Sequence, residues 1–293
     1  MDNKHRLGVI LVLLSALVFS TAGLFTKGVV AGAWDIIFWR GIFGTIFIFL
    51  YILWRGTFTS EFLQMGKIGW ALAIVGASGT AAYIPAFKFT TIANVSLIYA
   101  ATPMVSALLA WWWIGERASK LVLMASLVSL VGVVIIAWGS IGGLHLIGDI
   151  LACYMVVAMA IGFVIYRTYP KTPAAGPSAL SSILLMPFAL VFGSPFANSQ
   201  TDILIMIAFG LVFAVASITL SEGAKRLPAA ETSLLSTLEV VFAPLLAWAM
   251  FSEIPAIATF AGGGLILAGI LATQAWPKLP ASNYEENNHA DRA

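Results

Sequence analysis

Long apolar stretches follow one another along almost the whole chain, separated by short runs that contain Gly, Pro or charged residues. A helix needs about 20 mostly apolar residues to cross the hydrocarbon core of a bilayer, and each stretch has roughly that length. The pattern therefore predicts an all-α membrane protein with ten transmembrane helices. Their expected ranges are 7–30, 34–54, 67–87, 92–114, 121–139, 148–169, 176–194, 202–222, 229–251 and 257–276.

The composition agrees with this pattern and excludes several classes of protein. Of the 293 residues, 60% are hydrophobic and only 10% are charged, whereas about a quarter of a soluble chain is charged. Ten helices occupy about 200 residues, so the connections are too short for a catalytic domain. The net charge of +2 gives no indication of nucleic acid, and the single cysteine, Cys153, cannot form an internal disulfide. Function is expected inside the membrane.

The positions of Lys and Arg predict the orientation, because cationic connections stay on the cytoplasmic side. With the N-terminus inside, twelve cations fall on the cytoplasmic side and only Lys27 and Lys88 on the other, which predicts cytoplasmic N- and C-termini. A signal peptide is the rival interpretation of the first segment, but its apolar run is longer than the h-region of such a peptide. The twelve are Lys4, Arg6, Arg55, Lys67, Arg117, Lys120, Arg167, Lys171, Lys225, Arg226, Lys278 and Arg292.

The chain also repeats itself. The string LLAW at residues 108–111 recurs at 245–248, and a glutamate follows each copy after five residues, at Glu116 and Glu253. Each half then holds five helices, and because five is odd, the second copy enters the bilayer from the opposite side, as in transporters built from inverted repeats. The alternative is chance similarity, since apolar helices share Leu and Ala freely. The expected units are a first repeat at 1–139, a second at 148–276 and a mobile cytoplasmic tail at 277–293.

The segment from Leu108 to Ser119, LLAWWWIGERAS, closely resembles the end of the fourth helix in the EamA family of the drug/metabolite transporter superfamily. The segment LLAWAMFSE, Leu245 to Glu253, resembles its second copy, and the resemblance extends over roughly residues 7–276. Within the family, length and composition look most like the YddG-type bacterial exporters of aromatic and other amino acids. The resemblance implies a multi-pass transporter of the bacterial inner membrane that is not an enzyme. We expect an amino-acid substrate, membrane lipid and a coupling proton as partners, a monomer, and no metal or other cofactor.

Two charged residues stand out because they are predicted well away from the helix ends, where a charge in hydrocarbon is costly and needs a reason. Arg40 lies in the second helix and Glu239 in the ninth. Arg40 is predicted to attract a substrate carboxylate, and Glu239 to bind an ammonium group or exchange a proton. The alternative is a structural role, with the two residues paired to each other or to helix carbonyls.

Aromatic and hydroxyl groups complete the predicted binding site. Trp39, Tyr83 and Tyr99 lie beside polar or helix-breaking neighbours, and their faces and hydroxyl groups suit a mostly apolar pocket with a few polar groups. The alternative is ordinary helix packing. The hydroxyl-bearing candidates are Ser20, Thr21 and Ser236.

Helix-breaking and small residues have predicted roles as well. Proline within a helix removes a backbone donor and can kink it, and glycine in membranes most often permits close helix approach. The predicted kinks or hinges are Pro85, Pro103, Pro187 and Pro244, and the predicted close approaches are at Gly76, Gly79, Gly162 and Gly262 to Gly264.

An intramembrane enzyme and a channel are the alternatives from other classes. A Ser/His protease needs a histidine in the membrane, but His5, His145 and His289 lie outside the predicted helices, and paired aspartates are absent from the helix interiors. A channel needs a charged ring or a carbonyl filter, and neither pattern is evident. Export of another small metabolite or a drug-like cation, and uptake in place of export, remain open at this point.

Overall fold

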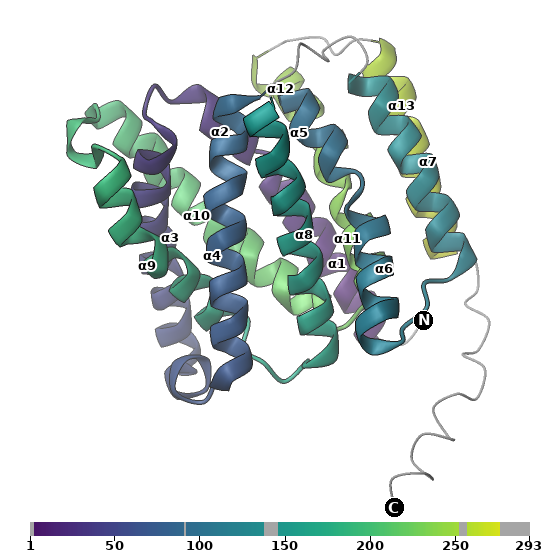
Figure 1. Cartoon of the computed structure of the whole chain (residues 1–293), viewed down its shortest axis with the longest axis horizontal. Helices are drawn as coiled ribbons and strands as arrows, with labels where there is room; N and C mark the ends of the chain where they lie inside the picture. Colours follow the sequence, from purple (N-terminus) through teal and green to yellow (C-terminus); the bar gives the residue numbers. More distant parts are fainter. Residues whose placement is uncertain (1–2, 91, 138–145, 252–256, 276–293) are drawn as a thin grey trace, which may run out of the picture.

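The computed structural model describes residues 3–90, 92–137, 146–251 and 257–275 as a set of apolar helices (Figure 1). A short π-helix, Thr59–Leu63, lies between α3 and α4, and a single 3₁₀ turn, Pro195–Ala197, lies between α9 and α10. The α-helices are α1 (Asn3–Phe19), α2 (Ala22–Gly28), α3 (Ala33–Arg55), α4 (Gly66–Phe89), α5 (Ile92–Tyr99), α6 (Thr102–Ile114), α7 (Lys120–Ala137), α8 (Leu146–Thr168), α9 (Ala175–Phe192), α10 (Gln200–Ala224), α11 (Ala229–Ser236), α12 (Leu238–Phe251) and α13 (Ile257–Ala275).

Eight helical segments among the described residues are long and apolar enough to cross a membrane. A shorter apolar helix, Lys120–Ile135, covers the fifth predicted window, and α11 and α12 together cover the ninth. The prediction of an all-helical membrane protein is confirmed. The predicted tail at 277–293 and the connection that contains Glu253 lie outside the described residues.

Three of the predicted spans are interrupted helices, and each interruption carries a hydroxyl group that bonds to the backbone. Ser20 bonds to the carbonyl of Leu17 between α1 and α2, and the hydroxyls at the two other interruptions bond in the same way to the carbonyl three residues earlier. Such bonds satisfy backbone groups that an interrupted helix leaves free in hydrocarbon. The other two hydroxyls belong to Thr102, the first residue of α6, and Thr237, between α11 and α12.

Corresponding helices of the two halves of the chain make equivalent packing contacts. Corresponding helices of the halves pack together as α3 with α9 and α7 with α13, which lie at opposite ends of the molecule in Figure 1. The packing of α4 on α8 has its counterpart in α10 on α1, and that of α3 on α10 in α9 on α4. The repeat seen in the sequence is therefore also a repeat in the packing.

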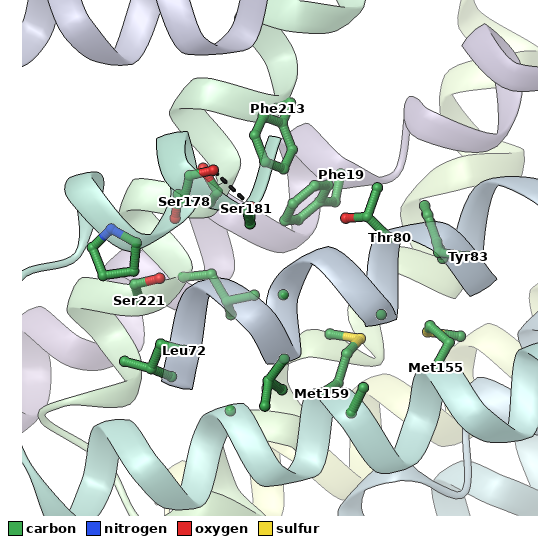
Figure 2. Close-up of a pocket in the computed structure, with 18 of the residues that line it drawn as sticks. Phe19, Leu72, Thr80, Tyr83, Met155, Met159, Ser178, Ser181, Phe213 and Ser221 are labelled. Carbon is green, nitrogen blue, oxygen red and sulfur yellow. Dashed lines mark hydrogen bonds between the residues drawn. The ribbon is translucent and has the colours of Figure 1, made fainter. Parts of the chain in front are cut away.

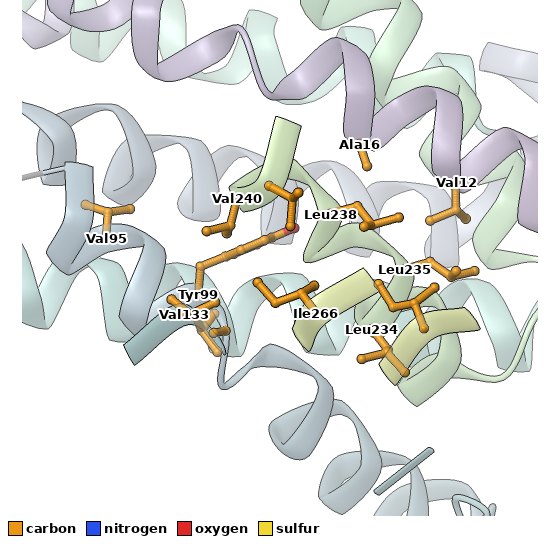
Figure 3. Close-up of a cluster of buried hydrophobic side chains, with 14 of the residues drawn as sticks. Val12, Ala16, Val95, Tyr99, Val133, Leu234, Leu235, Leu238, Val240 and Ile266 are labelled. Atoms are coloured by element: carbon orange, nitrogen blue, oxygen red, sulfur yellow. The ribbon is translucent and has the colours of Figure 1, made fainter. Parts of the chain in front are cut away.

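A shared core joins the halves near α12. In Figure 3, buried side chains from α1 and α5 of the first half meet those from α11, α12 and α13 of the second. Because lipid is as apolar as these side chains, tight packing and not water exclusion holds them together. The members drawn with labels are Val12, Ala16, Val95, Tyr99, Val133, Leu234, Leu235, Leu238, Val240 and Ile266.

Glycine permits the close approach of α7 and α13. A Cβ at Gly132 would lie 2.5 Å from the carbonyl oxygen of Gly262, too close for any side chain there. Of the predicted positions on α13, a Cβ at Gly263 would lie 3.3 Å from Cγ1 of Val241, whereas one at Gly264 would meet nothing within 4 Å, so the prediction does not hold for Gly264.

Both ends of α3 are bonded to the second half. At its start, Oδ1 of Asp35 accepts a hydrogen bond from the backbone N–H of Ser194 at 2.6 Å. After its end, Oε2 of Glu61 accepts bonds from the N–H groups of Ala175 and Gly176 at 3.1 and 2.8 Å, at the start of α9. A carboxylate at a helix N-terminus satisfies donors that the helix cannot. The pair of α3 and α9 is fixed at both ends, and the cavity lies beside it.

Candidate functional site

A cavity of about 200 Å³ lies between helices of both halves. A cavity needs about 10–15 Å³ to hold one water molecule, so this cavity has room for a small organic solute. Figure 2 shows side chains from α4, α8, α9 and α10 gathered around it, and α1, α2, α3, α5 and α12 also contribute. A mostly apolar cavity with few polar groups is typical of a small-molecule site.

Helices α4, α8 and α10 supply six lining residues each, and α4 and α8 each do so with one face. The lining residues on α4 and on α8 recur after three or four positions, which is the spacing of side chains on a single helix face. On α4 they are Leu72, Val75, Gly76, Gly79, Thr80 and Tyr83, and on α8 they are Met155, Ala158, Met159, Gly162, Phe163 and Tyr166.

Arg40 is a buried cation at the cavity wall, with 4% of its surface exposed. Its guanidinium carbon lies 4.1 Å from the ring centre of Phe213 and 5.6 Å from that of Phe209, both on α10. Its Nε has no hydrogen-bond partner, and the ion pairs formed by the described residues do not include Arg40. Aromatic faces stabilise a cation, but they leave its hydrogen-bond donors unused. The arrangement can accept an anion.

Glu239 lies on α12, at the boundary between this cavity and a smaller pocket of about 40 Å³. The hydroxyl of Tyr83 donates a hydrogen bond to its Oε1 at 3.2 Å. The two spaces share only three lining residues, namely Tyr83, Tyr99 and Glu239. A carboxylate and two phenol groups therefore separate the larger space from the smaller one.

The structure brings Arg40, Tyr83, Tyr99 and Glu239 together at one cavity, as the sequence analysis grouped them. The alternative of an ion pair between Arg40 and Glu239 does not occur among the described residues. Arg40 and Glu239 therefore line the same cavity without forming an ion pair with each other.

Of the three predicted hydroxyl groups, Thr21 and Ser236 are not among the residues that line either cavity, and all three groups bond to backbone carbonyls three or four residues earlier. Ser20 lines the smaller pocket. Thr21 bonds to the carbonyl of Val18 at 2.8 Å, and Ser236 to that of Thr232 at 2.9 Å. Because hydroxyl oxygens keep acceptor capacity after donating, these groups can still accept a bond.

Trp39 faces a different part of the molecule. Its indole N–H donates to the carbonyl of Pro195 at 2.7 Å, and its ring stacks on Phe43 at 5.8 Å between centres. It is not among the residues that line either cavity. The indole ties α3 to the α9–α10 connection.

The predicted hinge prolines differ in their places. Pro103 stands in the first turn of α6, directly after an interruption. Helix α4 continues through Pro85, α9 through Pro187, and α12 includes Pro244. Two interruptions, after Phe19 and at Thr237, occur without an adjacent proline.

Several lining residues were not singled out in the sequence. Met155, Met159 and Tyr166 on α8 face Thr80 and other residues of α4, and hydroxyls from α9 and α10 add polar groups. The three-to-four spacing along the sixth segment is the signal that could have found them, but it also fits ordinary packing. The hydroxyl-bearing residues are Ser178, Ser181, Ser217 and Ser221.

Another link between the halves lies at the end of the fourth span. Oε2 of Glu116 accepts a hydrogen bond from Nε of Arg167 at 2.6 Å, and its Oε1 accepts one from the backbone N–H of Ala229 at 3.3 Å. The conspicuous glutamate of the LLAWWWIGERAS segment thus joins three helix ends.

Comparisons with known proteins agree with this architecture. The family model for EamA-like transporters matches twice, at residues 6–138 and 146–274. The uncharacterized transporter YojE of Bacillus subtilis (strain 168) is 28% identical over 216 residues, 68% of each chain. The pseudopaline exporter CntI of Pseudomonas aeruginosa (strain UCBPP-PA14) is 24% identical over 274 residues, 90% of this chain and 95% of the exporter. A crystal structure that is 21% identical superposes with a TM-score of 0.80, covering 93% of this chain and 99% of its own, and so shares the fold.

Proposed function

Because this chain belongs to the EamA-like transporter family, we propose that it exports amino acids, aromatic and other neutral ones, across the inner membrane of a bacterium. The family is one of transporters and not of enzymes, and the chain is a multi-pass membrane transporter. Both named relatives are bacterial, and one is an exporter. These relatives support the direction of transport and the membrane.

One observation carries the choice of substrate, namely the two uncompensated charges at one cavity. An amino acid carries its carboxylate and its ammonium group on the same carbon atom, and it needs a cation and an anion to hold it out of water. Arg40 supplies the cation and Glu239 the anion, with Tyr83 bonded to Glu239. The apolar remainder of the cavity suits an apolar side chain.

Alternating access follows from the proposed arrangement of ten spans as two inverted repeats with cytoplasmic termini. The equivalent packing of the halves and the Lys and Arg bias support it. Rocking one repeat against the other around a central site exposes that site to one side and then the other. Glu239 is suited to carry the coupling proton, since it is the carboxylate at the boundary between the two cavities.

Another small metabolite is the alternative substrate, and the similarity to the pseudopaline exporter favours it. A simple drug-like cation is less suited, because it leaves Arg40 without an anion. Flux into proteoliposomes tests the choice with three solutes of similar shape: phenylalanine, its carboxyl-free amine and its amine-free acid. Phenylalanine flux well above that of both analogues supports the proposal. Equal flux of the amine, or no flux of any amino acid in either direction, overturns it.

A further inference from the structure

The place of the substrate side chain can be argued from the two cavities, if the amino acid is held as proposed above. Its charged groups then lie at the level of Tyr83 and Glu239, where the cavities meet. The side chain extends into one of them. The space is about 200 Å³ on one side and about 40 Å³ on the other, so a large side chain fits only in the larger cavity, whose wall includes one face each of α4 and α8.

These two helices run antiparallel, which sets which residues face each other. A Cβ at Gly79 would lie 3.3 Å from that of Ala158, and a Cβ at Gly148 would lie 2.7 Å from that of Thr90. In two antiparallel helices the numbers of facing residues have a nearly constant sum, which here is 237 to 238. Gly162 of α8 therefore lies at the level of residues 75 and 76 of α4. That level is seven residues from Tyr83, about 10 Å along the helix axis.

Gly162 leaves an open space at this depth. A Cβ there meets nothing within 4 Å, although Gly162 lines the cavity. The other two cavity glycines are different, because a Cβ at Gly76 would lie 3.3 Å from that of Ser181, and one at Gly79 equally close to Ala158. The prediction of close helix approach therefore fits Gly76 and Gly79, whereas Gly162 borders empty volume.

We propose that Gly162 determines substrate size by leaving room for the far end of a large side chain. The surrounding groups suit an aromatic or long aliphatic side chain: Met159 and Phe163 flank Gly162 on α8, and Tyr166 lies one turn further on. Thioether and ring contacts with an aromatic group are favourable. Ser221 of α10 lines the same cavity and offers a hydroxyl to a polar ring substituent. The substrate class is amino acids with large, mainly apolar side chains.

The test is to fill this space and compare substrates of different size. In proteoliposomes, the Gly162→Leu variant is expected to lose tryptophan and phenylalanine flux by about tenfold or more, because the leucine side chain takes up space that a large substrate side chain needs, while alanine flux changes less than about twofold. Gly264→Leu is the matched control, since a Cβ at Gly264 on α13 also meets nothing within 4 Å and Gly264 does not line the cavity. Equal loss of small and large substrates, or unchanged tryptophan flux, overturns the proposal.

A labelling experiment separates this inference from the proposed function. In a Cys153→Ser background, a Gly162→Cys variant is expected to react with a small water-soluble methanethiosulfonate, and tryptophan should slow the reaction several-fold more than glycine at equal concentration. If the wild type moves no amino acid, the proposed function fails, but the labelling still reports whether this position faces the cavity. Absence of labelling, or equal protection by glycine and tryptophan, contradicts the role of Gly162.

Discussion

The hydroxyl of Tyr83 donates a hydrogen bond to Oε1 of Glu239 at 3.2 Å, and this bond joins α4 of the first repeat to α12 of the second. It lies where the larger and the smaller cavity meet. In the proposed cycle, rocking of the repeats would change this contact, and a bound ammonium group would compete with Tyr83 for the same carboxylate. We therefore expect substrate binding and movement of the repeats to act on this one hydrogen bond.

Replacement of Arg40 tests the carboxylate site. Arg40→Ala removes a guanidinium that has no ion-pair partner among the described residues. A hydrogen bond to a charged group contributes about 1.5–3 kcal/mol, so we expect phenylalanine transport, as kcat/KM, to fall about 10- to 150-fold. The flux of the carboxyl-free amine should stay within about twofold. Radiolabelled uptake into proteoliposomes measures both.

Arg40→Lys and Arg55→Ala complete the Arg40 experiment. Lysine keeps the charge but not the planar fork that matches a carboxylate, so an intermediate loss is expected. Arg55 lies at the exposed end of the same helix, and its removal should leave transport unchanged. An equal loss for phenylalanine and its amine in Arg40→Ala would show that Arg40 supports the structure and does not bind the carboxylate.

Replacement of Glu239 tests the proton. A glutamine cannot take up and release a proton, but its carbonyl oxygen still accepts a hydrogen bond from an ammonium group. In Glu239→Gln, the acceleration of flux by an imposed pH gradient should disappear, while exchange of labelled for unlabelled substrate continues. The two assays are run on the same vesicles with and without the gradient. An undiminished response to the gradient assigns the proton to another group.

The sequence predicted the spans well because a bilayer demands long apolar helices whatever their partners are. It did not predict the interruptions of the first and ninth spans, after Phe19 and at Thr237, although the kink predicted at Pro103 lies at the interruption of the fourth. Proline was the signal used, yet the chain is interrupted at Thr237, while α4 continues through Pro85. A threonine that bonds to its own helix occurs both in intact helices and at interruptions, so its presence alone does not mark a break.

The candidate site was predictable only in part, and the charged residues were the informative ones. Arg40 and Glu239 stood out because a charge in hydrocarbon needs a reason. Trp39 was grouped with them because it is next to Arg40 in the sequence. Neighbouring side chains in a helix point about 100° apart, however, and the indole of Trp39 bonds to Pro195. Gly162 was predicted to permit close helix approach, because a glycine beside empty space and one beside another helix are alike in sequence.

The link between Glu116 and Arg167 has a measurable effect on stability. Both side chains are partly exposed, at 22% and 37%, so the pair is expected to contribute about 1 kcal/mol or less. Glu116→Ala, Arg167→Ala and the double variant form a cycle, measured as thermal unfolding in detergent. The double variant should lose less stability than the sum of the single ones, and added salt should shrink the difference. Arg117→Ala, on an exposed neighbour, is the control. Strict additivity would contradict the link.

The inverted arrangement of the repeats can be tested with two positions that correspond in them. Ser60 lies in the α3–α4 connection and Ala197 in the α9–α10 connection, 137 positions later, and both are exposed. In a Cys153→Ser background, Ser60→Cys should react with a membrane-impermeant thiol reagent only after the inner membrane is opened, whereas Ala197→Cys should react in intact spheroplasts. Parallel repeats place both positions on the same side. Labelling of both positions from one compartment would therefore contradict the inverted arrangement, and with it the rocking cycle. Labelling from opposite compartments is the expected result, because it places the cavity between two oppositely oriented copies, as alternating access requires.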